Sequence, residues 1–254
     1  MRDLDRIVAA TPLDQEQMLD LYGADAHKIT VIPLGVDTQM FRPIPRDEAR
    51  AAVGLDLPGT CRLVLFVGRL DPLKGLDTLL RAMCKLTELE PEVSKGLCLA
   101  VIGGDADENG AVLEEELECL DKLKKEVGFD DLVIFLGSRA QDTLAYYYSA
   151  AEVCVVPSHY ESFGLVALEA MACCTPVIAS RVGGLQHTVE DGLTGFLVPA
   201  GDPEALAEKL RVILTDDELR QRLATNARQK ALSFTWQSVG EHILSLYEEL
   251  WQKK

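Results

Sequence analysis

Short apolar runs alternate along this chain with longer segments whose apolar residues recur at helical spacing. The short runs are rich in Val, Ile and Leu and end at glycine or proline, which is typical of strands buried on both faces of a sheet. They predict strands at residues 63–68, 97–102, 132–136, 153–156 and 176–179, and a last strand within 191–198. Helical spacing predicts helices at residues 76–86, 117–127, 142–150, 166–172, 205–214, 216–231 and 238–251. The acidic stretch 105–118 is interpreted as a solvated face.

The order of these elements predicts the fold class. Strands alternate with helices from residue 63 to residue 198 through short links, which favours an α/β domain with a doubly wound, Rossmann-like parallel sheet. A further strand, helix and strand are predicted at residues 6–11, 15–22 and 28–33. Because two strands and one helix cannot bury their own apolar faces, this N-terminal piece is expected to need more sheet.

The stretch 158–172 carries the most informative chemistry, because a loop there runs into a helix that is apolar nearly all round and holds Glu169 at its middle. A buried carboxylate is costly unless it is paired or hydrogen-bonded. Glu169 therefore forms a structural ion pair, for example with Arg181, or accepts hydrogen bonds from ligand hydroxyls. Gly164 favours a ligand, since a missing Cβ permits close approach and free N–H groups at a helix start suit phosphate. Glu161, on the loop, adds a second carboxylate.

Two cations follow the first predicted strand of the sheet. Arg69 and Lys74 lie after Gly68, in a loop that leads into a helix. Ligands of α/β sheets bind beyond the carboxyl ends of the strands, so these side chains could flank one diphosphate. The alternative is a pair of solvated surface cations.

Another cation, Arg139, follows the strand at 132–136 and is either a contact for a nucleobase or a surface residue. Tyr146, Tyr147 and Tyr148 lie on the next helix and are interpreted as packing and rim residues rather than a platform for base stacking. His159 has no second histidine or aspartate spaced for a metal or a triad, and is interpreted as a structural loop residue.

These residues carry a family resemblance. Glu161, seven residues and then Glu169, with Ser162-Phe163-Gly164-Leu165 after the first glutamate, resembles the signature of retaining GT-B glycosyltransferases. Gly-Arg-Leu-Asp-Pro-Leu-Lys-Gly at 68–75 resembles the donor-phosphate loop of the same group. The resemblance implies the C-terminal half of a GT-B fold. It divides the chain into a remnant of the N-terminal acceptor domain with the interdomain crossing (1–40), a nucleotide-sugar-binding Rossmann-like domain (41–233) and a helix that packs back on the N-terminal domain (234–254).

The resemblance also implies roles for individual residues. Arg69 and Lys74 would stabilise the charge that grows on the leaving diphosphate, Glu161 would contact the transferred sugar, and Glu169 would hold the ribose hydroxyls. The remaining donor-binding residues would be Gly68, Arg139, Phe163, Gly164 and Leu165. No protein-bound metal and no cofactor are expected, because the cations take the place of a metal.

Composition narrows the class of partner. The net charge of −16 argues against nucleic acid and against electrostatic docking on anionic membranes. No apolar stretch is long enough for an integral membrane segment, and the start lacks a secretory signal, so a cytoplasmic location is expected. The seven cysteines are scattered without a Cys-x-x-Cys pair, and most of them are interpreted as small core residues in a reducing compartment.

Two hypotheses of function follow. The first is the donor domain of a retaining glycosyltransferase that binds a nucleotide-diphosphate sugar, with UDP-glucose favoured by the resemblance of the 68–75 loop to sucrose-phosphate-synthase-like proteins. The second is a binding module without transfer activity of its own, which needs the N-terminal GT-B domain or an equivalent partner. The sequence contains no Gly-x-Gly-x-x-Gly after a strand and no P-loop, which weakens an NAD enzyme and a P-loop enzyme.

Overall fold

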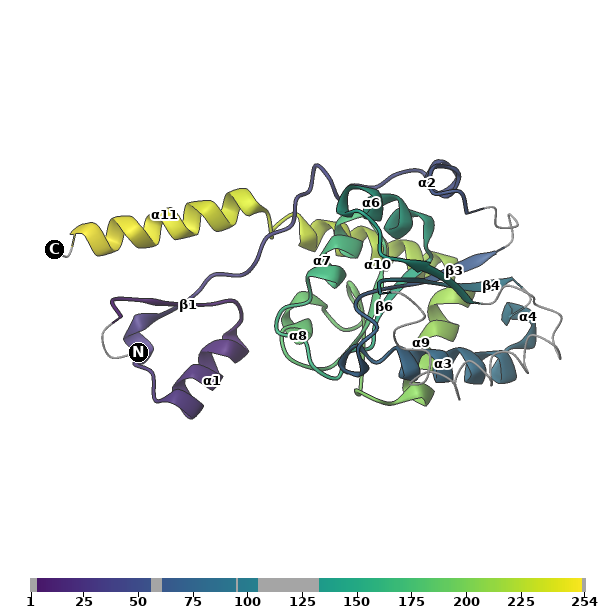
Figure 1. Ribbon diagram of the computed structural model, residues 1–254, viewed down its shortest axis with the longest axis horizontal. Helices are drawn as coiled ribbons and strands as arrows, with labels where there is room; N and C mark the ends of the chain where they lie inside the picture. The colour runs from purple at the N-terminus through teal and green to yellow at the C-terminus, as the bar shows by residue number, and fades with distance from the viewer. Residues whose placement is uncertain (1–3, 56–60, 95, 105–132, 253–254) are drawn as a thin grey trace.

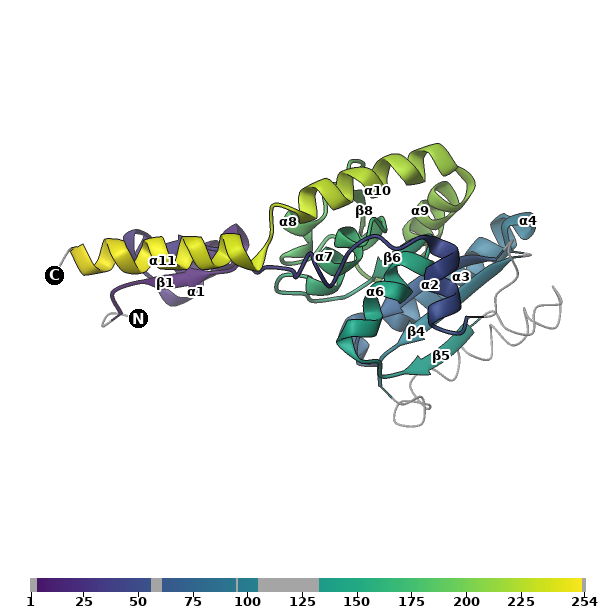
Figure 2. The same ribbon diagram turned by 90° about the horizontal axis from the view of Figure 1, so that it is seen from above.

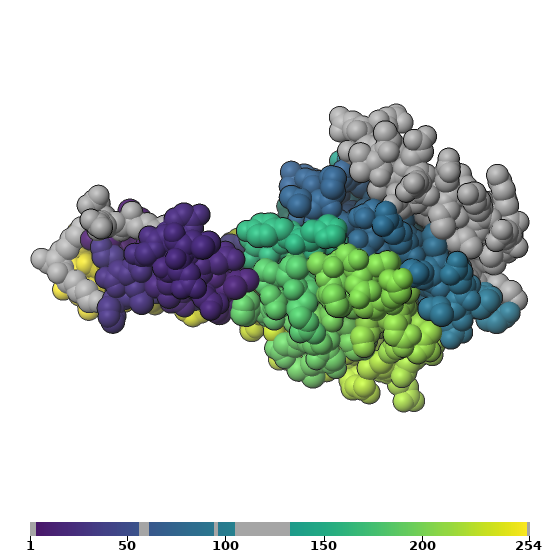
Figure 3. Space-filling model, turned by 90° about the horizontal axis from the view of Figure 1, so that it is seen from below, coloured from purple at the N-terminus to yellow at the C-terminus, as the bar shows by residue number. Residues whose placement is uncertain are grey.

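A larger α/β unit and a smaller N-terminal unit make up the computed structural model, which describes residues 4–55, 61–94, 96–104 and 133–252 (Figure 1). The helix expected at 117–127 and the acidic face expected at 105–118 lie outside the described residues. The space-filling view shows the N-terminal residues as a lobe beside the larger unit (Figure 3).

The larger unit is built on one parallel sheet with the strand order β5-β4-β3-β6-β7-β8. All of its strand pairs are parallel, which confirms the doubly wound sheet predicted from the sequence. The strands match the apolar runs closely: β3 Arg62–Val67, β4 Leu97–Ile102, β5 Val133–Gly137, β6 Val153–Val156, β7 Val177–Ser180 and β8 Gly195–Val198.

Helices cover both faces of this sheet (Figures 1 and 2). One face carries α2 (Arg46–Ala52), α6 (Gln141–Ala150) and α7 (Leu165–Ala172). The other carries α3 (Leu76–Leu89) and α9 (Pro203–Thr215). The other α-helices of the unit within the described residues are α4 (Pro91–Ser94), α8 (Leu185–Thr188) and α10 (Asp217–Ala231), of which α10 packs against α7 and α9.

Side-chain alternation along β3 explains why its sequence is continuously apolar. Leu63 and Leu65 belong to the core on the α6 and α7 face, whereas Val64 and Phe66 belong to the core on the α3 and α9 face. Because successive side chains of a strand point to opposite faces, a strand covered on both sides needs apolar residues throughout. The cysteines Cys61, Cys84, Cys154 and Cys173 are likewise buried, which confirms their interpretation as core residues.

The N-terminal unit pairs β1 (Ile7–Ala9) with β2 (Ile29–Val31) in parallel and adds α1 (Pro12–Tyr22) and the 3-10 helix η1 (Ala26–Lys28). None of the α1 residues is buried, as expected for a piece too small to cover its own faces. The last helix, α11 (Trp236–Gln252), lies beside this unit (Figure 2), where Arg6 and Glu249 form an ion pair of 2.8 Å. The division of the chain at residues 40 and 233 stays a prediction.

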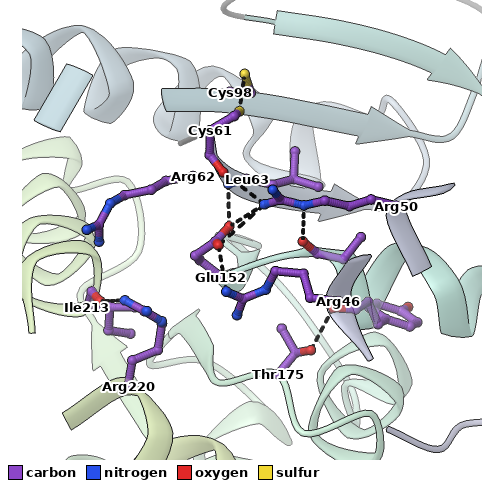
Figure 4. Close-up of polar contacts among 12 residues, drawn as sticks. Arg46, Arg50, Cys61, Arg62, Leu63, Cys98, Glu152, Thr175, Ile213 and Arg220 are labelled. Carbon is purple, nitrogen blue, oxygen red and sulfur yellow. Dashed lines mark hydrogen bonds and ion pairs between the residues drawn. The ribbon is translucent and has the colours of Figure 1, made fainter. Parts of the chain in front are cut away.

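A buried carboxylate, Glu152, fixes the amino-terminal edge of the large sheet (Figure 4). It forms ion pairs with Arg46 at 3.0 Å and with Arg50 at 3.4 Å, and it accepts a hydrogen bond from the backbone N–H of Leu63. Arg50 also donates to the carbonyls of Ala150 and Cys61. The cluster therefore joins α2 to the starts of β3 and β6 and neutralises a charge that burial would otherwise make costly.

Removing the carboxylate from this cluster is expected to destabilise the whole unit. Glu152→Ala leaves Arg50 buried without its counter-charge and should lower the free energy of unfolding by roughly 3–5 kcal/mol. Glu208→Ala is the control, because Glu208 pairs with Arg211 at 2.8 Å on the exposed side of α9 and should cost little. Urea denaturation measures both, and similar losses in the two variants would contradict the structural role of Glu152.

Candidate functional site

The direction in which the sheet grows reverses between β3 and β6. The chain runs from β3 through β4 to β5 on one side, and from β6 through β7 to β8 on the other. In open α/β sheets ligands bind beyond the carboxyl ends of the strands at such a reversal. The loops that follow β3 and β6, residues 68–75 and 157–164, contain most of the site residues predicted from the sequence.

Direct backbone contact holds these two loops together. The N–H of His159 donates to the carbonyl of Leu73 across 2.8 Å. Gly75 faces the carbonyl of Pro157 so closely that a Cβ on Gly75 would lie 2.2 Å from that oxygen. Gly75 also has a φ of +67°, a left-handed conformation that disfavours other residues. Only glycine fits here, and its place lets Lys74 reach the neighbouring loop.

Two further loops at the same edge of the sheet also approach the backbone of the candidate loops through a glycine. A Cβ on Gly103, after β4, would lie 1.7 Å from the carbonyl oxygen of Gly68. A Cβ on Gly183, after β7, would lie 1.8 Å from the carbonyl oxygen of Glu161. The N–H of Gly184 donates to that same carbonyl across 2.9 Å. Glycine contacts therefore fix the backbones that carry the candidate side chains.

An ion pair between Lys74 and Glu161 lies at the reversal of the sheet. Its Nζ and Oε2 atoms are 2.7 Å apart, and both side chains are mostly shielded, with exposed fractions of 25% and 18%. Lys74 ends a short 3-10 helix, η2 (Pro72–Lys74), which Asp71 caps by accepting a hydrogen bond from the N–H of Leu73. The structure thus brings together two predicted site residues that are 87 positions apart.

Arg69 lies on the same loop as Lys74 but points into solvent. Its side chain is 81% exposed, and its closest recorded partner is Asp71, at 3.8 Å. A charge held so loosely contributes little to stability and can move toward a ligand. Of the two cations predicted to flank a diphosphate, only Lys74 is already held in place.

Gly164 precedes α7 with a φ of +92°, and the space that a side chain would need is filled by Leu185, whose Cδ2 would lie 2.5 Å from a Cβ. This packing against α8 gives a reason for glycine that the sequence did not reveal. Phe163 is buried and packs edge-on against Phe234 at 6.2 Å between ring centroids. Its side chain serves the core, whereas Leu165, the first residue of α7, stays partly exposed.

Glu169 projects from α7 toward α6. The hydroxyl of Tyr148 donates to its Oε2 across 2.8 Å, and the side-chain amide of Gln141, at the start of α6, lies near the carboxylate. Burial raises the pKa of Glu169 above its ordinary value, and the Tyr148 hydroxyl and then the Gln141 amide oppose this rise because both favour the charged form. The ion pair suggested with Arg181 is wrong, because Arg181 pairs instead with Asp191 at 2.6 Å.

Arg139 lies between β5 and α6, and its side chain is exposed. Its Nε donates to the hydroxyl of Tyr147 across 3.1 Å, and an η nitrogen donates to the carbonyl of Ser138. Arg139 stands two residues before Gln141, which contacts Glu169, so the start of α6 brings both toward one edge of the sheet. Tyr147 and Tyr148 are buried, which confirms their interpretation as packing residues.

Comparison with known proteins agrees with this geometry. A family model described as Glycosyl transferases group 1 matches residues 47–230. The chain belongs to this family. Among curated glycosyltransferases, the D-inositol 3-phosphate glycosyltransferase of Frankia alni is 43% identical over 95% of this chain and 58% of its own length. The chain therefore spans little more than half of that relative.

Solved structures of glycosyltransferases are also similar. The sucrose-phosphate synthase of Thermosynechococcus elongatus is 38% identical, with a TM-score of 0.80 over 99% of this chain and 60% of that one. Anabaena HepE, solved in complex with UDP and glucose, is 25% identical, with a TM-score of 0.76 over 98% of this chain and 63% of that one. The fold predicted from the glycosyltransferase resemblance is confirmed.

Sequence reasoning missed the residues that support the candidate side chains. Tyr148 and Gln141 contact Glu169, yet neither lies in a motif of the glycosyltransferase signature. Their separation of seven positions places both on one face of α6, which is a signal that helical periodicity offers. The close backbone approaches at Gly75, Gly103 and Gly183 were not predicted either, because contact between distant loops leaves no local pattern.

Two searches of the described residues gave no result. No group of three or more His, Cys, Asp or Glu side chains there is arranged to hold a metal ion. None of the helices in the same part of the chain combines the length and the apolar character that a membrane span requires.

The loop contacts predict how a glycine substitution affects the site. Gly183→Ala should displace the Glu161 loop and lower the free energy of unfolding by roughly 1–3 kcal/mol beyond the cost of its positive φ. Gly192→Ala is a matched control, because Gly192 has a φ of +76° but no atom within 4 Å of the added Cβ. Urea denaturation gives both values, and equal losses would mean that the loops do not depend on this contact.

Proposed function

We propose that this chain is the donor-binding part of a retaining glycosyltransferase and binds a nucleotide-diphosphate sugar. The favoured donor is UDP-glucose or a sugar nucleotide that resembles it. The observation that carries the proposal is the Lys74–Glu161 ion pair at the reversal of the sheet. A cation and a carboxylate shielded from bulk solvent at this position suit a ligand that joins an anionic diphosphate to a polyhydroxylated sugar.

Lys74 and Arg69 are proposed to act on the diphosphate. The Lys74 ammonium has three donors, so it can keep Glu161 and still donate to a phosphate oxygen. The exposed Arg69 guanidinium can swing toward the same group and bind it with two parallel hydrogen bonds. Together they would stabilise the negative charge that grows on the leaving diphosphate during transfer.

The carboxylates and the backbone are proposed to bind the rest of the donor. Glu161, already held by Lys74, would accept hydrogen bonds from the transferred sugar, and Glu169 would accept them from the ribose hydroxyls. Arg139 would lie beside the nucleobase. The loop glycines Gly68 and Gly164 and the amide of Leu165 would border the phosphates, with Phe163 anchoring that backbone through its packing on Phe234.

The choice of UDP-glucose rests on similarity. Anabaena HepE, a structural relative, is described in complex with UDP and glucose. The sucrose-phosphate synthase relative supports the same class of donor through the similar loop at 68–75. Because this chain spans only 58% of the Frankia alni relative, transfer is proposed to need an N-terminal GT-B domain or an equivalent partner that supplies the acceptor groups.

A second candidate is a binding module that transfers nothing by itself. The exposed apolar side chains on α1 and α11 favour it, since such surfaces mark contacts with a further part: Leu21, Tyr22, Leu244, Tyr247 and Trp251. Turnover of UDP-glucose by the purified 254-residue chain would exclude this candidate. Binding of UDP-glucose without turnover would favour it.

Calorimetric titration with UDP, ADP and GDP tests the donor site. We expect one nucleotide to bind, and we expect Lys74→Ala, Arg69→Ala and Glu169→Ala each to weaken it about tenfold or more, as for a lost hydrogen bond to a charged group. Glu161→Ala should instead reduce the preference for the nucleotide sugar over the free nucleotide, because Glu161 is assigned to the sugar.

Lys85→Ala is the matched control for Lys74→Ala. Lys85 forms an ion pair of similar length, 2.8 Å, with Glu204 between α3 and α9. Its substitution should leave nucleotide affinity unchanged. Binding that survives in Lys74→Ala and Glu169→Ala with wild-type affinity would refute the proposed donor site.

A further inference from the structure

Tyr148 is completely buried and faces Glu169 from the neighbouring helix. Its hydroxyl donates to Oε2 of Glu169 across 2.8 Å. Its ring packs edge-on against Phe41 with 6.0 Å between the ring centroids, and its backbone carbonyl accepts a hydrogen bond from Oγ1 of Thr175. Because these contacts fix the ring, they also fix the position of the hydroxyl.

The arrangement leaves Glu169 able to bind something else. An ionised carboxylate has about four acceptor positions on its two oxygens. Tyr148 occupies one of these positions, and the side-chain amide of Gln141 lies near the carboxylate from the same face of α6. Glu169 is not fully buried, so the acceptor positions that remain are open to a ligand.

We infer that Tyr148 is a positioning residue that orients the Glu169 carboxylate toward the ribose hydroxyls of the nucleotide, an inference that rests on the proposed function. A glutamate side chain loses rotamer freedom when it binds a ligand, and that loss weakens binding. A carboxylate already held by a fixed hydroxyl has lost most of this freedom before the nucleotide arrives. Tyr148 thus raises affinity without touching the nucleotide.

The protonation states of the neighbouring groups fit this role. Burial, and after it the charge of Glu169, hold the pKa of Tyr148 well above its usual value, so the hydroxyl stays a donor. Within the described part of the chain, the thiols of Cys154 on β6 and Cys173 after α7 are the other titratable groups that interact with Glu169. Burial raises the pKa of both thiols, to about 12 for Cys173, so both stay neutral near pH 7.

Titration of Tyr148→Phe with UDP and with 2′,3′-dideoxyuridine diphosphate tests the inference. The variant keeps the buried ring and removes only the hydroxyl. We expect it to bind UDP roughly tenfold more weakly than the wild type, while its affinity for the dideoxy nucleotide stays close to that of the wild type. Tyr146→Phe, a half-buried tyrosine on the same helix, is the control and should change neither affinity.

The pH dependence of UDP binding is a second readout that a general loss of stability would not move. Binding that needs ionised Glu169 weakens as the pH falls through the Glu169 pKa. Tyr148→Phe removes a hydrogen bond that lowers this pKa, so the weakening should begin at a higher pH than in the wild type. If thermal unfolding shows that Tyr148→Phe does not fold, Gln141→Ala, at the exposed start of α6, should shift the profile in the same direction.

Each outcome decides between the two claims. One result is that Tyr148→Phe, or Gln141→Ala where that variant replaces it, binds UDP with wild-type affinity and keeps the ribose preference and the pH profile. That result would overturn the role of Tyr148 and leave the proposed function standing. Absence of nucleotide binding by the wild-type protein would overturn the proposed function and the role of Tyr148 with it. A ribose preference that shrinks in Tyr148→Phe and not in Tyr146→Phe would establish the positioning role.

Discussion

Close backbone contact between the loops at the carboxyl edge of the sheet is the constraint on which the site depends. The reversal of strand order places the loops after β3 and β6 side by side, but it does not by itself bring Lys74 within 2.7 Å of Glu161. That distance requires the backbones to approach until no side chain fits between them, as they do at Gly75 and Gly183. The glycines therefore act on function through geometry, since they determine how far the long charged side chains must reach.

The same constraint explains how a strongly acidic chain can be suited to an anionic ligand. A net charge of −16 repels phosphate at long range, but salt screens interactions beyond roughly 8–10 Å, so local charge decides binding. At the reversal of the sheet Lys74 is held by Glu161, and Arg69 remains exposed nearby on the same loop. The lysine gives a charge fixed in position, and the exposed guanidinium, held only loosely by Asp71, gives a charge that can move toward the ligand.

Local pattern predicted the strands and helices of the sheet well, because their burial on two faces leaves a continuous apolar signal such as that of β3. It also placed Lys74 and Glu161 in loops that follow strands, and Glu169 in the middle of the helix after the second of these loops. It could not predict that Lys74 contacts Glu161, since no local rule links positions 87 apart. It gave the wrong partner for Arg181 and missed Tyr148, because a hydrogen bond between two helices depends on how α6 packs against α7.

Glu169 shows why a buried charge in this fold favours a function over a purely structural role. Glu152 is also buried, but two arginines and a backbone N–H already bind its carboxylate within the fold. Glu169 has no such counter-charge among its recorded contacts in the described part of the chain; its partners Tyr148 and Gln141 are neutral, and burial raises its pKa. An apolar residue would pack in α7 at lower cost. A carboxylate that is oriented by neutral donors and still has free acceptor positions is suited to a ligand with hydroxyl groups, and that difference separates the two glutamates more clearly than burial does.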